Sequence, residues 1–291
     1  MAVNYCIRLL LTSLLISSFA YADNIERIRF VESKKYPDPQ QSYFVDLLTL
    51  ALDASKAQYG DYLLQPVTIE MAQARTSKSL QNNEFIDLTW RMTSKNIEQQ
   101  LQAIYFPILK GLMGNRIFII RKGSQNLFSK EITLAELQSI DLGQGHNWPD
   151  TDILLANGFN VVQGKANFLF EMLKKERFDY YPRALHEPWL ELVNENELTV
   201  EENLLLQYPA PMFFFVNKQN KKLQRRLSDG LFQLLESGEF EQFFLNHKIT
   251  SGILTKADVK NRKVFKLENP LLSEKTKALL RDERLWVKFT Q

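Results

Sequence analysis

Short apolar runs alternate along this chain with apolar residues at helical spacing. Residues 25–31 form the first run and predict a buried strand, and a loop follows over 32–37. Asp38, Pro39 and Gln41 then occupy the positions of an N-cap, a first-turn proline and an N3 glutamine. They predict a helix with one apolar stripe, which consists of Phe44, Leu47, Leu48, Ala51 and Leu52.

The same alternation continues to about residue 247. Further strands are expected over 62–69 (interrupted by Pro66), 85–90, 117–120, 140–142, 159–162, 178–181 and 211–216. Helices are expected over 72–80, 133–137, 150–156, 166–175, 184–193 and 223–235, with Ser237 and Gly238 ending the last of them and a short aromatic stripe over 240–244 after it. Alternating strands and helices predict an α/β protein with parallel sheets that are covered on both faces.

The length of the chain predicts two lobes. The chain has 291 residues, of which 45% are hydrophobic, and a domain holds about 150 residues on average. We expect lobe 1 to contain 23–112 and 217–249, and lobe 2 to contain 113–216. The chain then crosses between the lobes near 111–120 and near 208–216. The polar, lysine-rich residues 250–291 are expected to form a C-terminal strap packed against a lobe.

The first 22 residues have the order of an export signal. Arg8 precedes the apolar run from Leu9 to Ile16, and a small-x-small cleavage site follows over 20–22. No apolar run reaches the roughly 20 residues of a membrane-spanning helix. We therefore expect a cleaved, periplasmic protein without direct membrane insertion. Cys6, the single cysteine, leaves with the signal, which excludes disulfides, thiolate metal sites and cysteine nucleophiles from the processed chain.

The charge balance gives no reason to expect a polyanionic partner. Without Arg8, 35 basic residues stand against 34 acidic ones. This balance favours neither nucleic acid nor an anionic membrane. Three histidines without metal spacing, and the absence of dinucleotide or P-loop fingerprints, lead us to expect no metal and no cofactor. We expect a monomer.

Four segments, in this order, resemble the type 2 periplasmic solute-binding fold, specifically the family-3 proteins of polar amino-acid importers. They are Tyr36-Pro37; Asp87-Leu88-Thr89 with 93–96 and 105–108; Leu134 to Leu142 leading into Gly143-Gln144-Gly145; and Leu231 to Phe244 with Gly238. The resemblance covers about 25–247. It implies a small-molecule ligand held between two lobes, and an inner-membrane permease or sensor as partner.

Strand ends and helix N-termini at the cleft supply the candidate ligand-binding residues. Those from lobe 1 are Tyr36, Thr89, Trp90 and Arg91, and those from lobe 2 are Gln144, His146, Asn147, Trp148, Tyr181 and Arg183. The aromatic rings suit stacking, and the two arginines suit a bidentate grip on an anion. The alternative for each is structural: a core aromatic, a solvated His146, or an ion pair of Arg183 with Glu187 one turn along.

Two departures from the family's pattern bear on the ligand. Asn96 stands where the resemblance implies an arginine that clamps the ligand's α-carboxylate. Arg183 lies where it implies an aspartate that holds the ammonium group. An ordinary α-amino acid is thus a poor first guess, and we expect a small polar, anionic ligand gripped by Arg183.

We expect a non-catalytic protein that captures this ligand for an importer. A sensory or partner-binding protein without a transporter fits the same residues. An exported hydrolase is the third class; the chain lacks Gly-x-Ser-x-Gly, while paired catalytic carboxylates would meet only in the fold.

Overall fold

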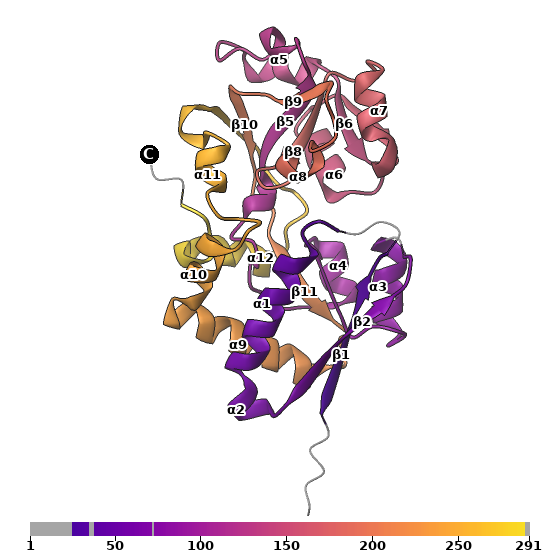
Figure 1. Cartoon of the computed structure of the whole chain (residues 1–291), viewed down its shortest axis with the longest axis vertical. Helices are drawn as coiled ribbons and strands as arrows, with labels where there is room; N and C mark the ends of the chain where they lie inside the picture. Colours follow the sequence, from indigo (N-terminus) through magenta and orange to yellow (C-terminus); the bar gives the residue numbers. More distant parts are fainter. Residues whose placement is uncertain (1–24, 35–37, 72, 289–291) are drawn as a thin grey trace, which may run out of the picture.

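The computed structural model describes residues 25–34, 38–71 and 73–288. The predicted signal over 1–22 and the candidate Tyr36 lie outside these residues. Two lobes are stacked one above the other and joined by several passages of the chain (Figure 1). Among the described residues, no helix combines the length and the apolar character that crossing a membrane requires.

Lobe 1, the lower lobe in Figure 1, has a parallel pair of strands, β1 and β2, and an antiparallel sheet in the order β3-β11-β4. Its strands are β1 (Glu26–Glu32), β2 (Tyr62–Thr68), β3 (Leu88–Met92), β4 (Gln102–Ala103) and β11 (Met212–Val216). Its helices are α1 (Gln41–Ala54), α2 (Lys56–Tyr59), α3 (Gln73–Gln81), α4 (Lys95–Gln100), α9 (Lys221–Ser237) and α10 (Glu239–Asn246).

Lobe 2 is built on one mixed sheet in the order β12-β10-β5-β8-β6-β7, with β9 paired to β5. Its strands are β5 (Asn115–Arg121), β6 (Leu142–Gly145), β7 (Val161–Gly164), β8 (Tyr180–Ala184), β9 (Leu198–Val200), β10 (Leu204–Gln207) and β12 (Lys263–Lys266). Its helices are α5 (Leu134–Ser139), α6 (Pro149–Ala156), α7 (Leu169–Lys174) and α8 (Pro188–Glu191).

The residues after α10 form short helices and one strand. These are α11 (Ile253–Lys256), β12 and α12 (Glu274–Ala278). Short 3-10 helices occupy Leu112–Gly114, Gln125–Leu127, Ala166–Phe168, Val259–Asn261, Leu279–Arg281 and Glu283–Leu285. The lobe boundaries at 112/113 and 216/217 stay predictions, while the observed pairing places β11 beside β3 and β4 and β12 beside β10.

The prediction of purely parallel sheets was wrong. β5 runs antiparallel to β8, β9 and β10, and β11 runs antiparallel to β3 and β4. β5 and β11 are the strands that follow a passage from the other lobe, and each enters its new sheet from the opposite end. The parallel pairs are β1 with β2, β6 with β7 and β8, and β10 with β12.

The apolar stripe of α1 is buried as predicted, but the helix starts later than expected. Gln40 is its N-cap residue, and the carboxylate of Asp38 accepts a bond from the Gln40 backbone N–H at 2.8 Å, which closes a turn before the helix. α1 packs closely on α9. A Cβ built on Gly230 of α9 would lie 1.9 Å from the carbonyl oxygen of Ala51, so only glycine permits this approach.

Several predicted boundaries shift in ways that affect the site. β8 extends to Ala184, so Arg183 lies within a strand and not in the loop after it. Trp148 is the N-cap residue of α6 with Pro149 in its first turn, so this helix starts one residue before the predicted 150. The helix expected over 184–193 contracts to α8. Pro66 does not interrupt β2, because β2 has a partner on one side only and a missing N–H is tolerated there.

Candidate functional site

A cavity of about 250 Å³ lies between the lobes. Lobe 1 lines it with Asp38, Pro39, Gln40, Phe44, Trp90, Arg91, Met92 and Met212, and the first crossing and lobe 2 line it with Met113, Arg116, Trp148, Pro149, Asp150, Arg183, Glu187 and Glu191. The lobe 1 side therefore carries most of the apolar groups, and the lobe 2 side carries five of the seven charged residues.

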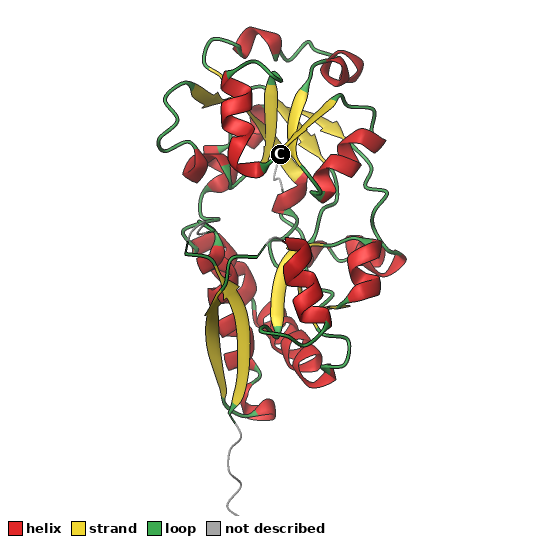
Figure 2. Ribbon diagram, turned by 90° about the vertical axis from the view of Figure 1, so that its right-hand side faces the viewer, coloured by secondary structure: helices red, strands yellow, loops and turns green. Residues whose placement is uncertain are grey.

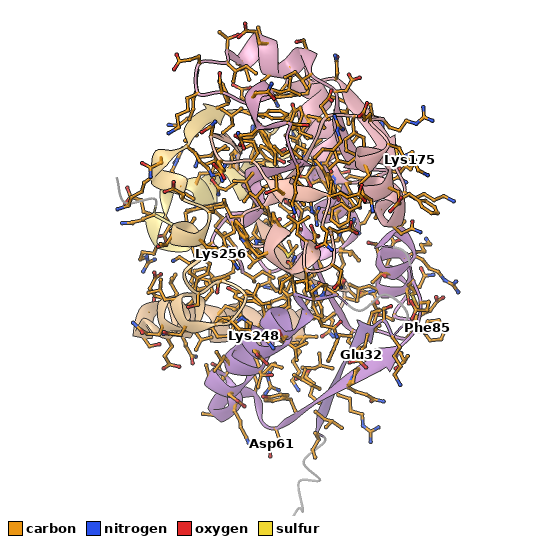
Figure 3. All side chains as sticks on the ribbon, turned by 45° about the horizontal axis from the view of Figure 1, so that its top comes forward. Glu32, Asp61, Phe85, Lys175, Lys248 and Lys256 are labelled. Carbon is orange, nitrogen blue, oxygen red and sulfur yellow. The ribbon has the colours of Figure 1, made fainter. Side chains whose placement is uncertain are left out.

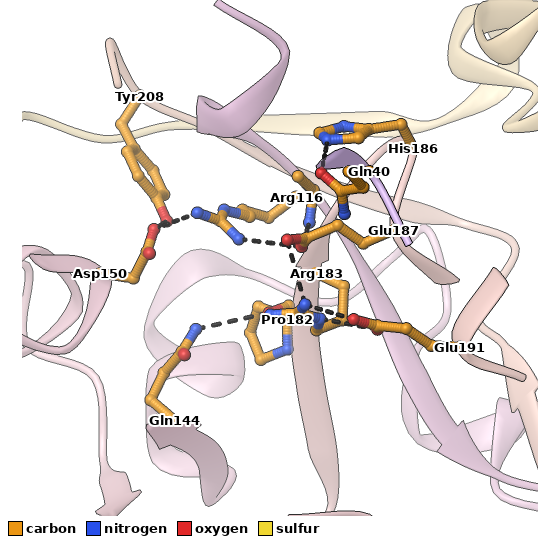
Figure 4. A network of polar contacts seen from close by, with 11 residues as sticks. Gln40, Arg116, Gln144, Asp150, Pro182, Arg183, His186, Glu187, Glu191 and Tyr208 are labelled. Atoms are coloured by element: carbon orange, nitrogen blue, oxygen red, sulfur yellow. Dashed lines mark hydrogen bonds and ion pairs between the residues drawn. The ribbon is translucent and has the colours of Figure 1, made fainter. Parts of the chain in front are cut away.

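Arg116, at the start of β5, is the centre of the charged side (Figure 4). Its side chain is 1% exposed and forms ion pairs with Asp150 and, at 3.5 Å, with Glu187. The Tyr208 hydroxyl donates to the same Asp150 carboxylate at 2.5 Å. Burial opposes the charge of Arg116, but the carboxylates outweigh it and raise the pKa of its guanidinium above the usual value.

Arg183 is held by two glutamates of α8, namely its N-cap residue Glu187 and its last residue Glu191. Its Nε donates to Glu191 at 2.8 Å, a second guanidinium N–H donates to the other oxygen of Glu191, and Glu187 lies 3.0 Å away. The guanidinium lies 5.3 Å from the ring centre of Trp148 and 5.1 Å from that of Tyr181. Although burial opposes its charge, Glu187 and its other partners raise the pKa of Arg183 well above the usual value.

The lobes meet at Gln40 and His186. Gln40 Oε1 and His186 Nε2 are 2.8 Å apart, and the side chains come from opposite lobes (Figure 4). Burial lowers the pKa of His186 to about 4, although Glu187 acts in the opposite direction. The imidazole is therefore neutral near pH 7, with its Nε2–H donating to Gln40.

Carboxylates of both lobes face this junction. Burial raises the pKa of Asp38 in lobe 1, and the negative charges of Glu187 and Glu191 in lobe 2 raise it further, against a hydrogen bond from Gln40 that lowers it. Four carboxylates and three guanidinium groups line the cavity, so its charges are nearly balanced. Within the described ranges, no cluster of three or more His, Cys, Asp or Glu residues is arranged to hold a metal ion.

The cavity brings together four of the predicted site residues, namely Trp90, Arg91, Trp148 and Arg183. Trp90 stacks on Phe44 with ring centres 5.3 Å apart. Arg91 donates to the hydroxyl of Ser77. Trp148 covers Gly145, where a Cβ would lie 2.5 Å from its indole ring. The bidentate grip of Arg183 on a ligand anion stays a prediction, because its hydrogen-bonding groups contact Glu187 and Glu191 in this structure.

The other predicted residues lie outside the cavity. Thr89 lines an adjoining pocket in lobe 1, and Asn147 lines another beside Asn96. His146 is exposed. Tyr181 is 4% exposed and packs with Phe170 and Phe178. Gln144 is fully buried and points toward the carbonyl of Pro182, 3.4 Å from its Nε2 (Figure 4).

The sequence prediction did not include Arg116, Asp150, Glu191, Tyr208 or the methionines among the site residues. Arg116 precedes the strongly apolar run from Ile117 to Ile120, which gave a local signal: a cation in a buried strand requires a buried carboxylate as partner. The sequence does not identify that partner. Asp150 is 34 residues away along the chain, and Glu187 is 71 residues away.

The fold is that of type 2 periplasmic binding proteins. No protein-family model matches the sequence, and no curated protein matches it. Among solved structures, the arginine-specific periplasmic binding protein STM4351 of Salmonella typhimurium is similar at 15% identity, with a TM-score of 0.53 over 75% of this chain and 97% of that one.

Two further solved structures have a similar fold. YtmK of Bacillus subtilis, described as a probable amino-acid ABC transporter extracellular-binding protein, shares 14% identity with a TM-score of 0.55 over 76% of this chain and 97% of its own. An ancestral arginine-binding protein bound to arginine shares 15% identity with a TM-score of 0.52 over 75% of this chain and 96% of its own. The fold predicted from the sequence motifs is confirmed.

Proposed function

We propose that the protein captures a small polar solute between its lobes, outside the cytoplasmic membrane, and presents it to a membrane importer. The cavity lined from both lobes carries this proposal, because closing of two lobes around a solute is how a hinged two-lobed fold binds. The solved structures of similar fold are described as binding proteins, several of them for amino-acid ABC transporters. No catalytic step is proposed, since Asp150, Glu187 and Glu191 all form ion pairs with arginine.

The two sides of the cavity indicate the chemistry of the solute. Phe44, Trp90 and the three methionines suit an apolar or flat body. The charged side suits an anionic group at Arg183. Of the two glutamates on this arginine, Glu191 is the outer one, with a side chain 22% exposed against 8% for Glu187. A ligand carboxylate that replaced Glu191 would keep the guanidinium paired on both sides.

The solute need not be an α-amino acid. Asn96, where the resemblance implies the carboxylate clamp, lies outside the cavity and accepts a bond from Gln100 at 2.9 Å. The resemblance implies an aspartate as the partner of the ligand's ammonium group, but a cation, Arg183, occupies that position. A carboxylate grip in lobe 2 then replaces the one missing from lobe 1.

A thermal-shift screen of organic acids, amino acids, sugars and peptides tests the proposal, because a ligand that binds the folded state adds about 2.7 kcal/mol of stability at a hundredfold excess over its Kd. For an anionic hit, Arg183→Ala should weaken binding about tenfold or more by titration calorimetry, with Arg183→Lys recovering part of the loss. Glu191→Gln is the matched variant. This variant should bind an anionic ligand more tightly, because it removes the negative charge that competes with the ligand for Arg183. Weaker binding would instead show that Glu191 holds a cationic group of the ligand.

A further inference from the structure

The described chain passes between the lobes four times, two more than the two crossings expected from the sequence. After α10 in lobe 1, the chain adds β12 to the sheet of lobe 2, returns to lobe 1 as α12, and ends against the first crossing. Figure 2 shows several loop segments between the lobes. We call residues 250–288 the strap.

The strap is anchored in lobe 2 by backbone pairing. β12 runs parallel to β10, and hydrogen bonds extend the pairing on both sides: Lys263 N–H to Asn203 at 2.7 Å, and Leu267 N–H to Gln207 at 2.8 Å. The Asn157 side chain at the end of α6 then binds both backbone groups of Glu268, at 2.8 and 3.1 Å.

Only Asn269 and Pro270 separate this anchor from Leu271, whose carbonyl, like that of Pro270, accepts a hydrogen bond from Lys95 of lobe 1. The carbonyl of Leu271 accepts from the Lys95 backbone N–H at 2.7 Å. The Glu98 carboxylate accepts from the hydroxyls of Ser273, at 2.6 Å, and Thr276, at 2.7 Å. Two residues between two anchors leave little slack, since an extended chain spans at most about 3.6 Å per residue.

The strap also contacts both crossings. The Asn269 amide donates to the carbonyl of Pro209, in the second crossing, at 2.7 Å. At the first crossing, the Trp286 ring covers Gly111 so closely that a Cβ there would lie 2.5 Å from the ring. Val287 N–H donates to the Lys110 carbonyl at 2.8 Å, and the Lys110 ammonium donates to the Arg284 carbonyl at 2.7 Å.

Beyond Asn269, the strap also lies between parts of the two lobes other than the crossings. Pro270 and Leu271 line a pocket together with Asn147, Pro149 and Asp152 of lobe 2 and with residues of α3 and α4 in lobe 1. An opening motion that separates α6 from α4 must therefore stretch this part of the strap. It would break the bonds of Asn269, Leu271 or the Glu98 carboxylate.

We propose that the strap ties the two lobes together and limits how far the cleft opens in the absence of ligand. The inference does not depend on the identity of the solute. A cleft kept near its closed arrangement needs less rearrangement on binding, so its apparent affinity is reduced less by unproductive open forms.

The test measures the distance between lobes in the ligand-free protein by double electron–electron resonance. Spin labels are placed at Lys78→Cys on α3 and Lys175→Cys just after α7, both exposed and in different lobes; Figure 3 labels Lys175. The protein is prepared without the predicted signal, which contains Cys6. One strap variant ends at Leu267. The other, Asn269→Ala with Ser273→Ala and Thr276→Val, removes the side-chain hydrogen bonds of the strap to Pro209 and Glu98 and keeps its backbone bonds with Lys95 and Lys110.

The parent should give one narrow distance distribution, and both strap variants a longer mean and a broader distribution. Lys277→Ala is the control, because this exposed residue of α12 pairs with Glu274 in the same helix. If the shortened chain does not fold, the triple variant decides the matter, since Glu98 keeps its bonds from Thr93 and Tyr105 in that variant. A folded triple variant with the parent's distribution would overturn the proposal.

Discussion

Arg116 shows how one residue organises several segments of this molecule. Its guanidinium joins β5 to α6 through Asp150 and to the segment before α8 through Glu187. Tyr208, beside the second crossing, completes the cluster by bonding Asp150. Ion pairs at this depth hold their partners in place, because an unpaired buried charge is costly.

Arg116→Met should lower the free energy of unfolding by roughly 3–5 kcal/mol, because it leaves the buried carboxylate of Asp150 without its cation and Glu187 with Arg183 as its remaining one. Urea unfolding followed by circular dichroism measures the loss. Arg121→Met is the matched control on the same strand, since the Asp179 partner of Arg121 is 37% exposed and water can solvate it after the change. Equal losses in the two variants would contradict this account of Arg116.

Local patterns predicted some of these residue contacts but not others. The pair of Arg183 with Glu187, four residues along, was foreseen as an alternative because a short spacing brings the side chains together. The pairs of Arg116 depend on how β5, α6 and α8 come together, which no local pattern encodes. The same holds for the contact of Gln40 with His186, which are 146 residues apart.

At the level of elements, the contact between α1 and α9 depends on a residue without a side chain. Gly230→Ala should destabilise the protein by about 1–3 kcal/mol, because the added methyl group meets the backbone of Ala51 and overpacks the contact. The change would otherwise favour the helix by about 1 kcal/mol. Gln233→Ala, on the exposed face of α9, should be neutral or slightly stabilising in the same thermal melt. A higher melting temperature for Gly230→Ala would show that α1 and α9 can separate at little cost.

Elements with strong apolar periodicity were predicted well, and short paired strands were not. The stripes of α1 and α9 repeat over several turns, so each identifies its helix without reference to the rest of the fold. β12 has four residues, two of them lysines, and becomes a strand only because β10 is beside it. Its position in the sheet of lobe 2 could not be read from 263–266 alone.

For the whole molecule, burial of His186 predicts a dependence of stability on pH. The pKa of this group is about 4 in the folded protein, below its usual value of 6.5. Its contribution to stability is fully present above pH 6.5 and is lost as the pH falls toward 4, because the unfolded chain then binds a proton that the folded protein does not. The full loss is about 3 kcal/mol.

Urea unfolding at pH 7 and pH 4.5 should show this loss in the parent and a smaller one in His186→Gln. Carboxyl groups such as Asp38 titrate in both proteins, so the difference between the two pH slopes isolates the histidine. Parallel stability curves over this range would mean that His186 takes up its proton in the folded state as readily as in the unfolded one.

The position of β12 near the end of the chain affects the order in which the molecule can be completed. During synthesis the N-terminus is made first. One edge of β10 stays without its partner until about nine-tenths of the chain has been made, because β12 begins at Lys263 of 291 residues. Lobe 1 is also completed late, because β11 and α9 follow all of β5 to β10 in the sequence. Native pairings over such long separations form slowly. The native fold can therefore be completed only after most of the polypeptide has been made, because its last sheet strand and the closing elements of lobe 1 come late in the chain.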